Sequence, residues 1–327
     1  MNECILGIDI GKTNIRVAIS EGTPELKYYC KQPYRSSTPQ EFEDQLVAAI
    51  GRALEESGYS RDTITAIGID VPAIVNRQDG TIFYGPAFDY MGDYSITQRL
   101  GKLYGVPVVA DVDTVMAAWG ELWAGTGTAC GNFALITWGT GLGAGLIVNG
   151  EVVEGANNLF PEFGHSVVSD DDWPCDCGSR GCLNILATGP GIARHGAIAL
   201  EQGKDTLLRT LAGNDPGKVT SPMVFEAAEA GDQAAKDILE RVGVLLGRLC
   251  ANLVYALQPE KIVMVGGLTE RSHWVLETMT RTMHDRCWLL FRGFTKCEIV
   301  SSSLGDMAGV LGAIRKAQLK LAGGATP

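Results

Sequence analysis

Residues 5–19 read ILGIDIGKTNIRVAI, which is an apolar run, a Gly11-Lys12-Thr13 turn and a second run in which apolar and polar residues alternate. Such alternation is typical of a strand with one buried face, so the segment predicts two strands, 5–10 and 14–19, joined by a tight turn. Residues 133–148 repeat this layout as a strand over 133–137, a glycine-rich turn and a strand over 145–148. Two such units in one chain indicate a duplicated fold, with one copy in each of two domains.

The regions around these two units alternate between strand and helix patterns. Thr38 and Glu41 form a predicted capping box around Pro39, and the apolar positions that follow predict a helix ending at Gly58. Further strands are predicted over 64–71, 106–110 and 261–265, and further helices over 116–123, 225–257 (interrupted near Gly231) and 306–321. This alternation predicts an α/β protein. We expect a first domain over 1–115, completed by residues 306–327, and a second domain over 116–305.

The composition predicts a cytoplasmic globular protein. The 327 residues are more than a single core usually holds, and the net charge of −11 disfavours nucleic acid or an anionic membrane as a partner. The first residues lack the basic segment of a signal peptide, and the most apolar stretch, 133–148, is too short to span a bilayer. The 41 glycines exceed the usual share of about 7%, which indicates many tight turns or close approaches to a ligand.

Both glycine-rich turns imitate nucleotide-binding motifs that their context excludes. Gly7 and Gly11 enclose three residues instead of the four of a P-loop, and both turns lead into a strand where a P-loop or a dinucleotide fingerprint needs a helix. The backbone N–H groups and hydroxyls of such turns can still cradle phosphate oxygens, and Asp9 could hold a hydrated Mg²⁺. The alternative is that both are ordinary tight hairpins. Their occurrence at matched places favours phosphate binding.

The two turns and a third motif, Val265-Gly266-Gly267, resemble the phosphate-1, phosphate-2 and adenosine motifs of the actin/hexokinase/heat-shock chaperone superfamily. Members of that superfamily bind ATP in a cleft between two related domains. The resemblance implies an α/β fold of two actin/hexokinase-like (ribonuclease H-like) domains, with ATP and Mg²⁺ as cofactors. It also implies that ATP is bound by Asp9, Gly11, Lys12, Thr13, Gly139, Thr140, Gly141, Gly143, Gly266 and Gly267.

A metal site is predicted where His165 precedes three clustered cysteines, Cys175, Cys177 and Cys182. One imidazole and three thiols suit tetrahedral Zn²⁺ in a closed, structural site; without a metal, the thiols would be ordinary core residues. The run Cys-x-Cys-Gly-x-x-Gly-Cys, preceded by Glu-x-Gly-His, resembles the signature of the repressor/open-reading-frame/kinase (ROK) family of sugar kinases. The resemblance extends from about residue 4 to 316, although the spacing from His165 to Cys175 is a little shorter than is usual in the family.

The ROK resemblance implies roles for several further residues. His165 is expected to bind zinc through one nitrogen and to contact the sugar with the other side of its ring, and Glu162 to accept hydrogen bonds from sugar hydroxyls. Asn184 and Asp89 occupy further expected sugar-binding positions. Homodimers are common in the family, so a homodimer is expected here.

A sugar kinase needs a carboxylate that accepts the proton of the attacking hydroxyl, and the strand over 106–110 is followed by two candidates. Alignment with the family on the segment ending at Glu121 assigns the catalytic role to Asp113. Alternatively, Asp111 is the base and Asp113 fills an Asn-like position, or both carboxylates merely cap a loop.

Three departures from the family concern the sugar. Val112 replaces an Asn, Asn184 replaces a Glu, and the loop over 85–89 lacks the usual Asn. Because buried polar partners discriminate between sugars, we expect a hexose other than glucose, an amino-sugar derivative or a related polyol, phosphorylated at its primary hydroxyl. The alternative is a sugar-sensing regulatory or non-catalytic member of the family. The repressors of the family carry a DNA-binding helix-turn-helix ahead of the first phosphate motif, which here begins by residue 7, and the acidic charge also disfavours that branch.

Overall fold

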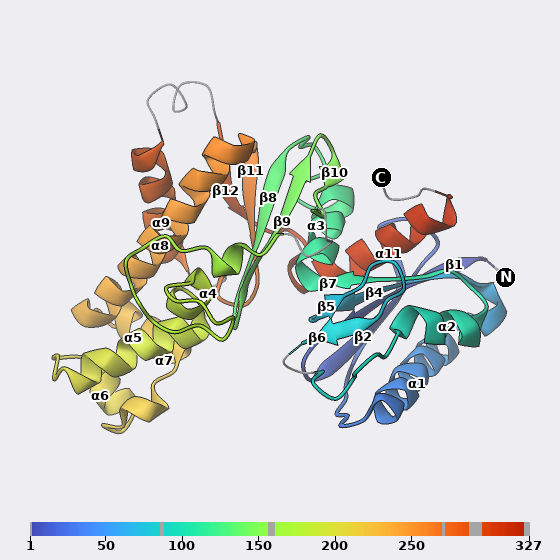
Figure 1. The fold of residues 1–327 in the computed structure, drawn as a ribbon, viewed down its shortest axis with the longest axis horizontal. Coiled ribbons are helices and arrows are strands. Elements are labelled where there is room, and N and C mark those ends of the chain that lie inside the picture. Colours follow the sequence, from blue (N-terminus) through green and yellow to red (C-terminus); the bar gives the residue numbers. More distant parts are fainter. Residues whose placement is uncertain (1, 86–87, 156–160, 270–271, 288–295, 324–327) are drawn as a thin grey trace. The chain divides into compact units, whose positions relative to one another are not determined.

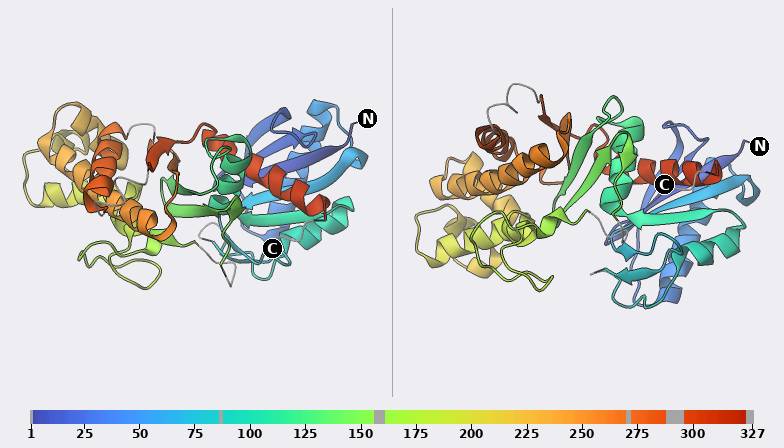
Figure 2. Two further views of the ribbon diagram at one scale, coloured as in Figure 1. Left: turned by 90° about the horizontal axis from the view of Figure 1, so that it is seen from above. Right: turned by 45° about the horizontal axis from the view of Figure 1, so that its top comes forward.

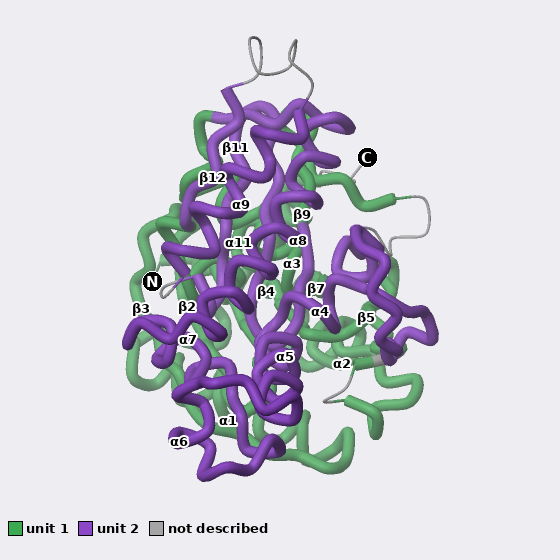
Figure 3. The backbone as a smooth tube through the Cα atoms, turned by 90° about the vertical axis from the view of Figure 1, so that its left-hand side faces the viewer, with its two compact units in different colours: residues 1–129, 145–160, 302–327 green, residues 130–144, 161–301 purple. Residues whose placement is uncertain are grey.

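The computed structural model describes residues 2–85, 88–155, 161–269, 272–287 and 296–323, and the chain divides into two compact units (Figures 1 and 3). Unit 1 contains residues 1–129, 145–160 and 302–327, and unit 2 contains residues 130–144 and 161–301. Each unit combines strands and helices, and the two large sheets share one strand order. The predicted α/β fold of two related, actin/hexokinase-like domains is confirmed.

The first sheet has the strand order β3-β2-β1-β4-β7. Its strands are β1 (Cys4–Ile10), β2 (Asn14–Ser20), β3 (Leu26–Pro33), β4 (Ile64–Val71) and β7 (Val108–Val112). The strands β1 and β2 form the predicted antiparallel hairpin, while β1, β4 and β7 run parallel. Two short strands, β5 (Ile74–Val75) and β6 (Ile82–Tyr84), pair separately. β7 begins two residues later than predicted, because residues 106–107 connect it to the left-handed Gly105 that ends α2 (Ile96–Tyr104).

Helices cover both faces of the first sheet (Figure 1). α1 (Pro39–Ser57) and α2 lie on one face, and α3 (Asp113–Ala124) and α11 (Ala308–Leu321) lie on the other. α1 is capped as predicted: the Thr38 hydroxyl accepts a hydrogen bond from the Glu41 N–H at 3.2 Å, and Gly58 ends the helix with φ 76°. A 3₁₀ turn, Gly305–Met307, precedes α11.

α11 packs directly against β1 and β4, as both views of Figure 2 show. Glycines permit this close approach: a Cβ atom at Gly7 would lie 2.5 Å from the Val310 carbonyl oxygen, and one at Gly68 would overlap the Ala313 carbonyl. Apolar side chains of the same helix, including Ile314, complete a buried cluster with Ile5 of β1. The C-terminal helix is therefore an integral part of the unit that contains the N-terminal hairpin.

The second sheet has the order β10-β9-β8-β11-β12. Its strands are β8 (Phe133–Trp138), β9 (Leu142–Val148), β10 (Glu151–Val152), β11 (Lys261–Val265) and β12 (Glu298–Ser301). The boundary between the units runs through β9. β9 begins three residues earlier than predicted, so Gly143 lies in the strand and the turn is shorter than the sequence indicated. Glycine can adopt the extended backbone of a strand. Because the prediction assigned the glycines of this segment to a turn, it placed the start of β9 too late.

Unit 2 is rich in helices, namely α4 (Leu183–Leu186), α5 (Gly189–Glu201), α6 (Leu208–Leu211), α7 (Ser221–Glu229), α8 (Gln233–Leu257) and α9 (His273–Arg286). The predicted interruption near Gly231 is confirmed, since this residue has φ 96° between α7 and α8. Within the described part of the chain, every helix is too short or too polar to cross a membrane.

Candidate active site

The first predicted phosphate turn is braced by its own backbone and by a tyrosine. The Gly11 N–H donates to the Asn14 carbonyl oxygen at 2.9 Å, and the Tyr34 hydroxyl donates to the Gly11 carbonyl oxygen, also at 2.9 Å. Lys12 and Thr13 are exposed at the tip of the turn. The turn is therefore held in shape while an ammonium group and a hydroxyl remain accessible to an anion.

Asp9, the predicted Mg²⁺ partner, lies at the end of β1 and pairs with a cation. Its Oδ2 atom lies 2.7 Å from Nη1 of Arg16, whose Nη2 lies 3.3 Å from Asp306. Burial raises the pKa of Asp9 above its usual value, and Arg16 opposes that rise. Asp9 thus combines partial burial with a guanidinium that favours its charged form.

Asp9 belongs to a row of three carboxyl groups on neighbouring parallel strands. Asp9 of β1 is in register with Asp70 of β4, which is in register with Asp111 of β7. Aligned residues of adjacent parallel strands lie about 4.8 Å apart and point to the same face of the sheet. The first sheet therefore concentrates negative charge near the carboxyl ends of its parallel strands.

Asp111 is a buried structural anion. Nε of Arg77 donates to both carboxylate oxygens, at 2.9 and 2.8 Å, and the Lys316 ammonium donates to Oδ2. Lys316 also donates to Glu154 Oε1 at 2.9 Å, and Nη1 of Arg77 donates to the Glu154 carbonyl oxygen at 3.1 Å. Asp111 is 1% exposed. With its oxygens occupied by two cations, Asp111 is poorly suited to accept a substrate proton.

Asp113 has a different environment two residues later. It is the first residue of α3, it is exposed, and its Oδ1 accepts a hydrogen bond from the Thr114 N–H at 2.7 Å. Glu121, which anchors the family alignment, is fully buried in the same helix: its Oε2 accepts from the Thr126 N–H at 2.7 Å, and its Oε1 accepts from the Ser302 hydroxyl. Glu121 fixes the C-terminal part of α3, and Asp113 presents a carboxylate at the other end.

The second predicted phosphate turn, between β8 and β9, is held by side chains. The Thr137 hydroxyl accepts a hydrogen bond from the Gly143 N–H at 3.1 Å, and Asn184 Oδ1 accepts from the Leu142 N–H at 2.9 Å. Asn184, predicted to bind the sugar, thus supports the turn in this structure. Gly139, Thr140 and Gly141 form the turn itself, with the Gly139 N–H donating to the Gly141 carbonyl oxygen at 3.0 Å.

The predicted adenosine motif follows β11 directly. Gly266 has φ 115°, and a Cβ atom there would lie 2.5 Å from the Trp138 carbonyl oxygen, whereas one at Gly267 would meet nothing within 4 Å. Gly266 is needed for the approach of this segment to the end of β8. A side chain at Gly267 would extend into open space.

The four predicted zinc ligands come together. The ligand atoms of His165, Cys175, Cys177 and Cys182 lie within 4.8 Å of one another, with Cys175 Sγ 3.7 Å from His165 Nδ1 and Cys177 Sγ 3.6 Å from Cys182 Sγ. Gly178 and Gly181, with φ 87° and 70°, form the tight loop between the thiols. A backbone hydrogen bond at Ser179 lowers the pKa of Cys177, and burial raises the pKa of Cys182 to about 12.

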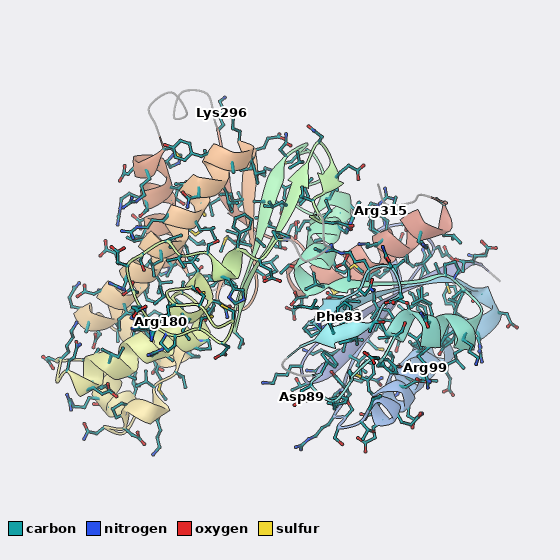
Figure 4. All side chains as sticks on the ribbon, in the orientation of Figure 1. Phe83, Asp89, Arg99, Arg180, Lys296 and Arg315 are labelled. Carbon is teal, nitrogen blue, oxygen red and sulfur yellow. The ribbon has the colours of Figure 1, made fainter. Side chains whose placement is uncertain are left out.

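The two remaining predicted sugar contacts have exposed side chains. Glu162 directly precedes the short 3₁₀ helix Phe163–His165, and desolvation raises its pKa while His165 opposes that rise. Asp89 is labelled in Figure 4 and follows the buried Phe88. Residues 86–87 of the predicted sugar loop lie outside the described residues.

Comparison with known proteins identifies the family. The ROK family model matches residues 5–319. The chain belongs to the ROK family. A glucokinase of Halalkalibacterium halodurans is 32% identical over 94% of this chain and 92% of its own length. A ROK family glucokinase from Streptomyces griseus, solved in complex with glucose and AMPPNP, is 26% identical with a TM-score of 0.77, covering 96% of this chain and 99% of its own. The transcriptional regulator NagC of Escherichia coli is 25% identical over 96% of this chain and 76% of its own length.

Sequence reasoning about this ROK-family chain missed the charged residues around Asp111. Arg77, Glu154 and Lys316 carry no local signal, because their contacts join segments 34 to 205 residues apart. Asp70 did carry a local signal in the sequence, because it is a charged residue within the apolar run 64–71. A carboxylate at such a position needs a partner or a function.

Proposed function

We propose that the protein is an ATP-dependent sugar kinase that phosphorylates the primary hydroxyl of a hexose or hexose derivative, with Asp113 as general base. Membership of the ROK family and the similarity to glucokinases support kinase activity. The observation that carries the assignment of the base is the contrast between the two candidate carboxylates. Asp111 is buried between Arg77 and Lys316, whereas Asp113 is exposed at the start of α3.

In the proposed reaction, a sugar hydroxyl donates its proton to Asp113 as its oxygen attacks the γ-phosphorus of ATP. The bond between that phosphorus and the β,γ-bridging oxygen breaks, and ADP leaves. The N–H groups of Lys12, Thr13, Thr140 and Gly141 are proposed to bind phosphate oxygens, and the Lys12 side chain adds positive charge. Gly11, Gly139 and Gly143, whose N–H groups donate within the turns, are proposed to let the phosphates approach the backbone closely. Gly266 and Gly267 accommodate the adenosine. Mg²⁺, held near Asp9, supplies charge neutralisation of the phosphates when bound.

His165, Cys175, Cys177 and Cys182 are proposed to hold one structural zinc ion. Three thiols and one imidazole with mutually close ligand atoms fit the donor set that zinc prefers. Such a site would order the loop over 165–182. His165 in this loop and Glu162, three residues before it, are proposed to contact the sugar. Elemental analysis of the purified chain should find one zinc per chain, and a Cys182→Ser variant should lose it.

The sugar is proposed to differ from glucose. Val112 cannot donate or accept a hydrogen bond through its side chain, and Asn184 Oδ1 already accepts from the Leu142 N–H. Both features alter partners that discriminate between hydroxyl configurations. Asp89 and Glu162 remain the proposed acidic contacts.

The second candidate is a sugar-sensing regulatory protein without catalysis. The similarity to NagC across most of this chain supports it, as do the altered sugar positions. The two candidates differ in whether a sugar stimulates ADP release.

The test is an ADP-release assay with a panel of hexoses, N-acetyl amino sugars, ketoses and polyols. The wild type should turn over at least one of them, and Asp113→Asn should lower kcat by about 10²- to 10⁴-fold. Asp93→Asn, at an exposed carboxylate of the same unit, is the matched control and should retain full activity. Sugar binding without turnover in the wild type would establish the sensor instead, and full activity of Asp113→Asn would reject this base.

A further inference from the structure

Asp70 differs from its two neighbours in the row of carboxyl groups on β1, β4 and β7. Asp9 pairs with Arg16, and Asp111 with Arg77 and Lys316. Asp70, between them, has no ion-pair partner among the residues that the structure describes. The central carboxyl group of the row is therefore the one whose charge is not balanced.

Asp70 is also deeply buried and incompletely hydrogen-bonded. It is 3% exposed, and its Oδ1 has no hydrogen-bond partner within the described part of the chain. The start of α11 closes over the other oxygen, because a Cβ atom at Gly309 would overlap Oδ2. Burial of an unpartnered carboxylate oxygen is unfavourable unless a ligand satisfies it.

The electrostatic surroundings of Asp70 favour a cation. Burial and the neighbouring Asp9, Asp113 and Asp111 raise its pKa well above the usual value, and the opposing effect of Arg16 is smaller. A cation near two or more of these carboxylates would lower their mutual repulsion and supply the missing partner.

We propose that Asp70 and Asp9 together form a divalent-cation site at the carboxyl ends of β1 and β4, with Mg²⁺ as its ion. The proposal rests on the proposed function, which assigns Mg²⁺ to Asp9, and adds a second protein carboxylate to that site. Oxygen donors from carboxylates are the ligands that Mg²⁺ takes in proteins. Arg16 contacts Oδ2 of Asp9, so Oδ1 is the atom of Asp9 available to the ion.

The competing explanation is that Asp70 simply holds a proton. A protonated carboxyl group would need no metal, and its replacement by the neutral, equally sized Asn would leave cation binding unchanged. The two explanations therefore differ in the affinity of the protein for a metal in the absence of nucleotide.

The experiment titrates the nucleotide-free, full-length protein with Mn²⁺ and measures free Mn²⁺ by electron paramagnetic resonance. Asp70→Asn should raise the Kd by about tenfold or more. The control is Asp306→Asn, which removes an exposed carboxylate that also contacts Arg16 and should change the Kd less than twofold. Unchanged affinity in Asp70→Asn would overturn the proposal, and so would an equal loss in both variants, because that result indicates diffuse attraction.

A second measurement needs no variant, and so remains decisive if Asp70→Asn does not fold. Wild-type protein loaded with Fe²⁺ and treated with ascorbate and peroxide should be cleaved near residues 9–11 and 70–72, as mapped by mass spectrometry. Cleavage confined to other segments would reject the site. Neither measurement uses sugar or ATP, so a failure here leaves the kinase proposal standing, and a failure of turnover leaves this site standing.

Discussion

The first sheet carries carboxyl groups near the ends of its parallel strands, whereas the second sheet carries uncharged residues at the corresponding positions. Asp9 and Asp70 are in register on β1 and β4, and Thr137 and Val265 are in register on β8 and β11. Asp9 and Thr137 each stand two residues before a glycine of their turn, Gly11 and Gly139. Sheets with the same strand order therefore present different groups at the ends of their parallel strands. The first sheet presents carboxyl groups, and the second presents a hydroxyl and backbone groups. The fold requires the apolar pattern, and the residues at the strand ends are free to differ.

The largest expected effect comes from the charges of the first sheet. Asp111→Asn removes one of the two carboxylates, Asp111 and Glu154, that balance the buried Arg77 and Lys316, which should destabilise the protein by about 3–5 kcal/mol. Urea denaturation followed by circular dichroism measures this loss, and the exposed Asp93→Asn should stay within about 0.5 kcal/mol of the wild type. Equal free energies of unfolding for Asp111→Asn and Asp93→Asn would mean that the buried ion pairs do not stabilise the protein. The two sheets would then differ in composition but not in what stabilises them.

A smaller effect is expected where the second sheet relies on backbone shape. Gly266→Ala forces a side chain into φ 115° and toward the Trp138 carbonyl, so it should cost about 1–3 kcal/mol. Its affinity for ATP should fall as well. Gly267→Ala is the matched control, because its Cβ meets open space, and thermal unfolding should hardly change. Equal midpoints for the two variants would mean that the close approach at Gly266 is unimportant.

The smallest expected effect is an increase in thermal stability, in the variant Asp70→Asn. Because the pKa of Asp70 is raised in the fold by burial, Asp9, Asp113 and Asp111, the folded state binds its proton more tightly than the unfolded state. Its contribution to stability is present below the unfolded carboxyl pKa of about 3.9 and is lost as pH rises toward the folded pKa. Without divalent cations, Asp70→Asn should therefore raise the unfolding midpoint by a few degrees at neutral pH, with the gain shrinking toward pH 4. A pH-independent difference would contradict this explanation.

Local patterns predicted the architecture and the two turns, but only part of the candidate site. The alternation over 14–19, the capping residues of α1 and the spacing of the cysteines all act between near neighbours in sequence, and each element formed as expected. The ion pairs of Asp111 depend on α11 packing onto the first sheet, which no local pattern encodes. Gly143 shows the opposite error, since a glycine that suggested a turn lies within β9.

The packing of α11 also has a consequence for biosynthesis. β1 and β4 emerge from the ribosome early, but the helix that covers their glycine-lined face consists of residues 308–321. Unit 1 therefore cannot complete its core until residues 308–321 have been made, and residues 130–144 and 161–301 of unit 2 are synthesised before them. Lys316 belongs to the same helix. The ion pair between Lys316 and Asp111 therefore cannot form until residues 308–321 have been synthesised. The unit that contains the row of carboxyl groups is therefore completed after the described part of unit 2 has been made.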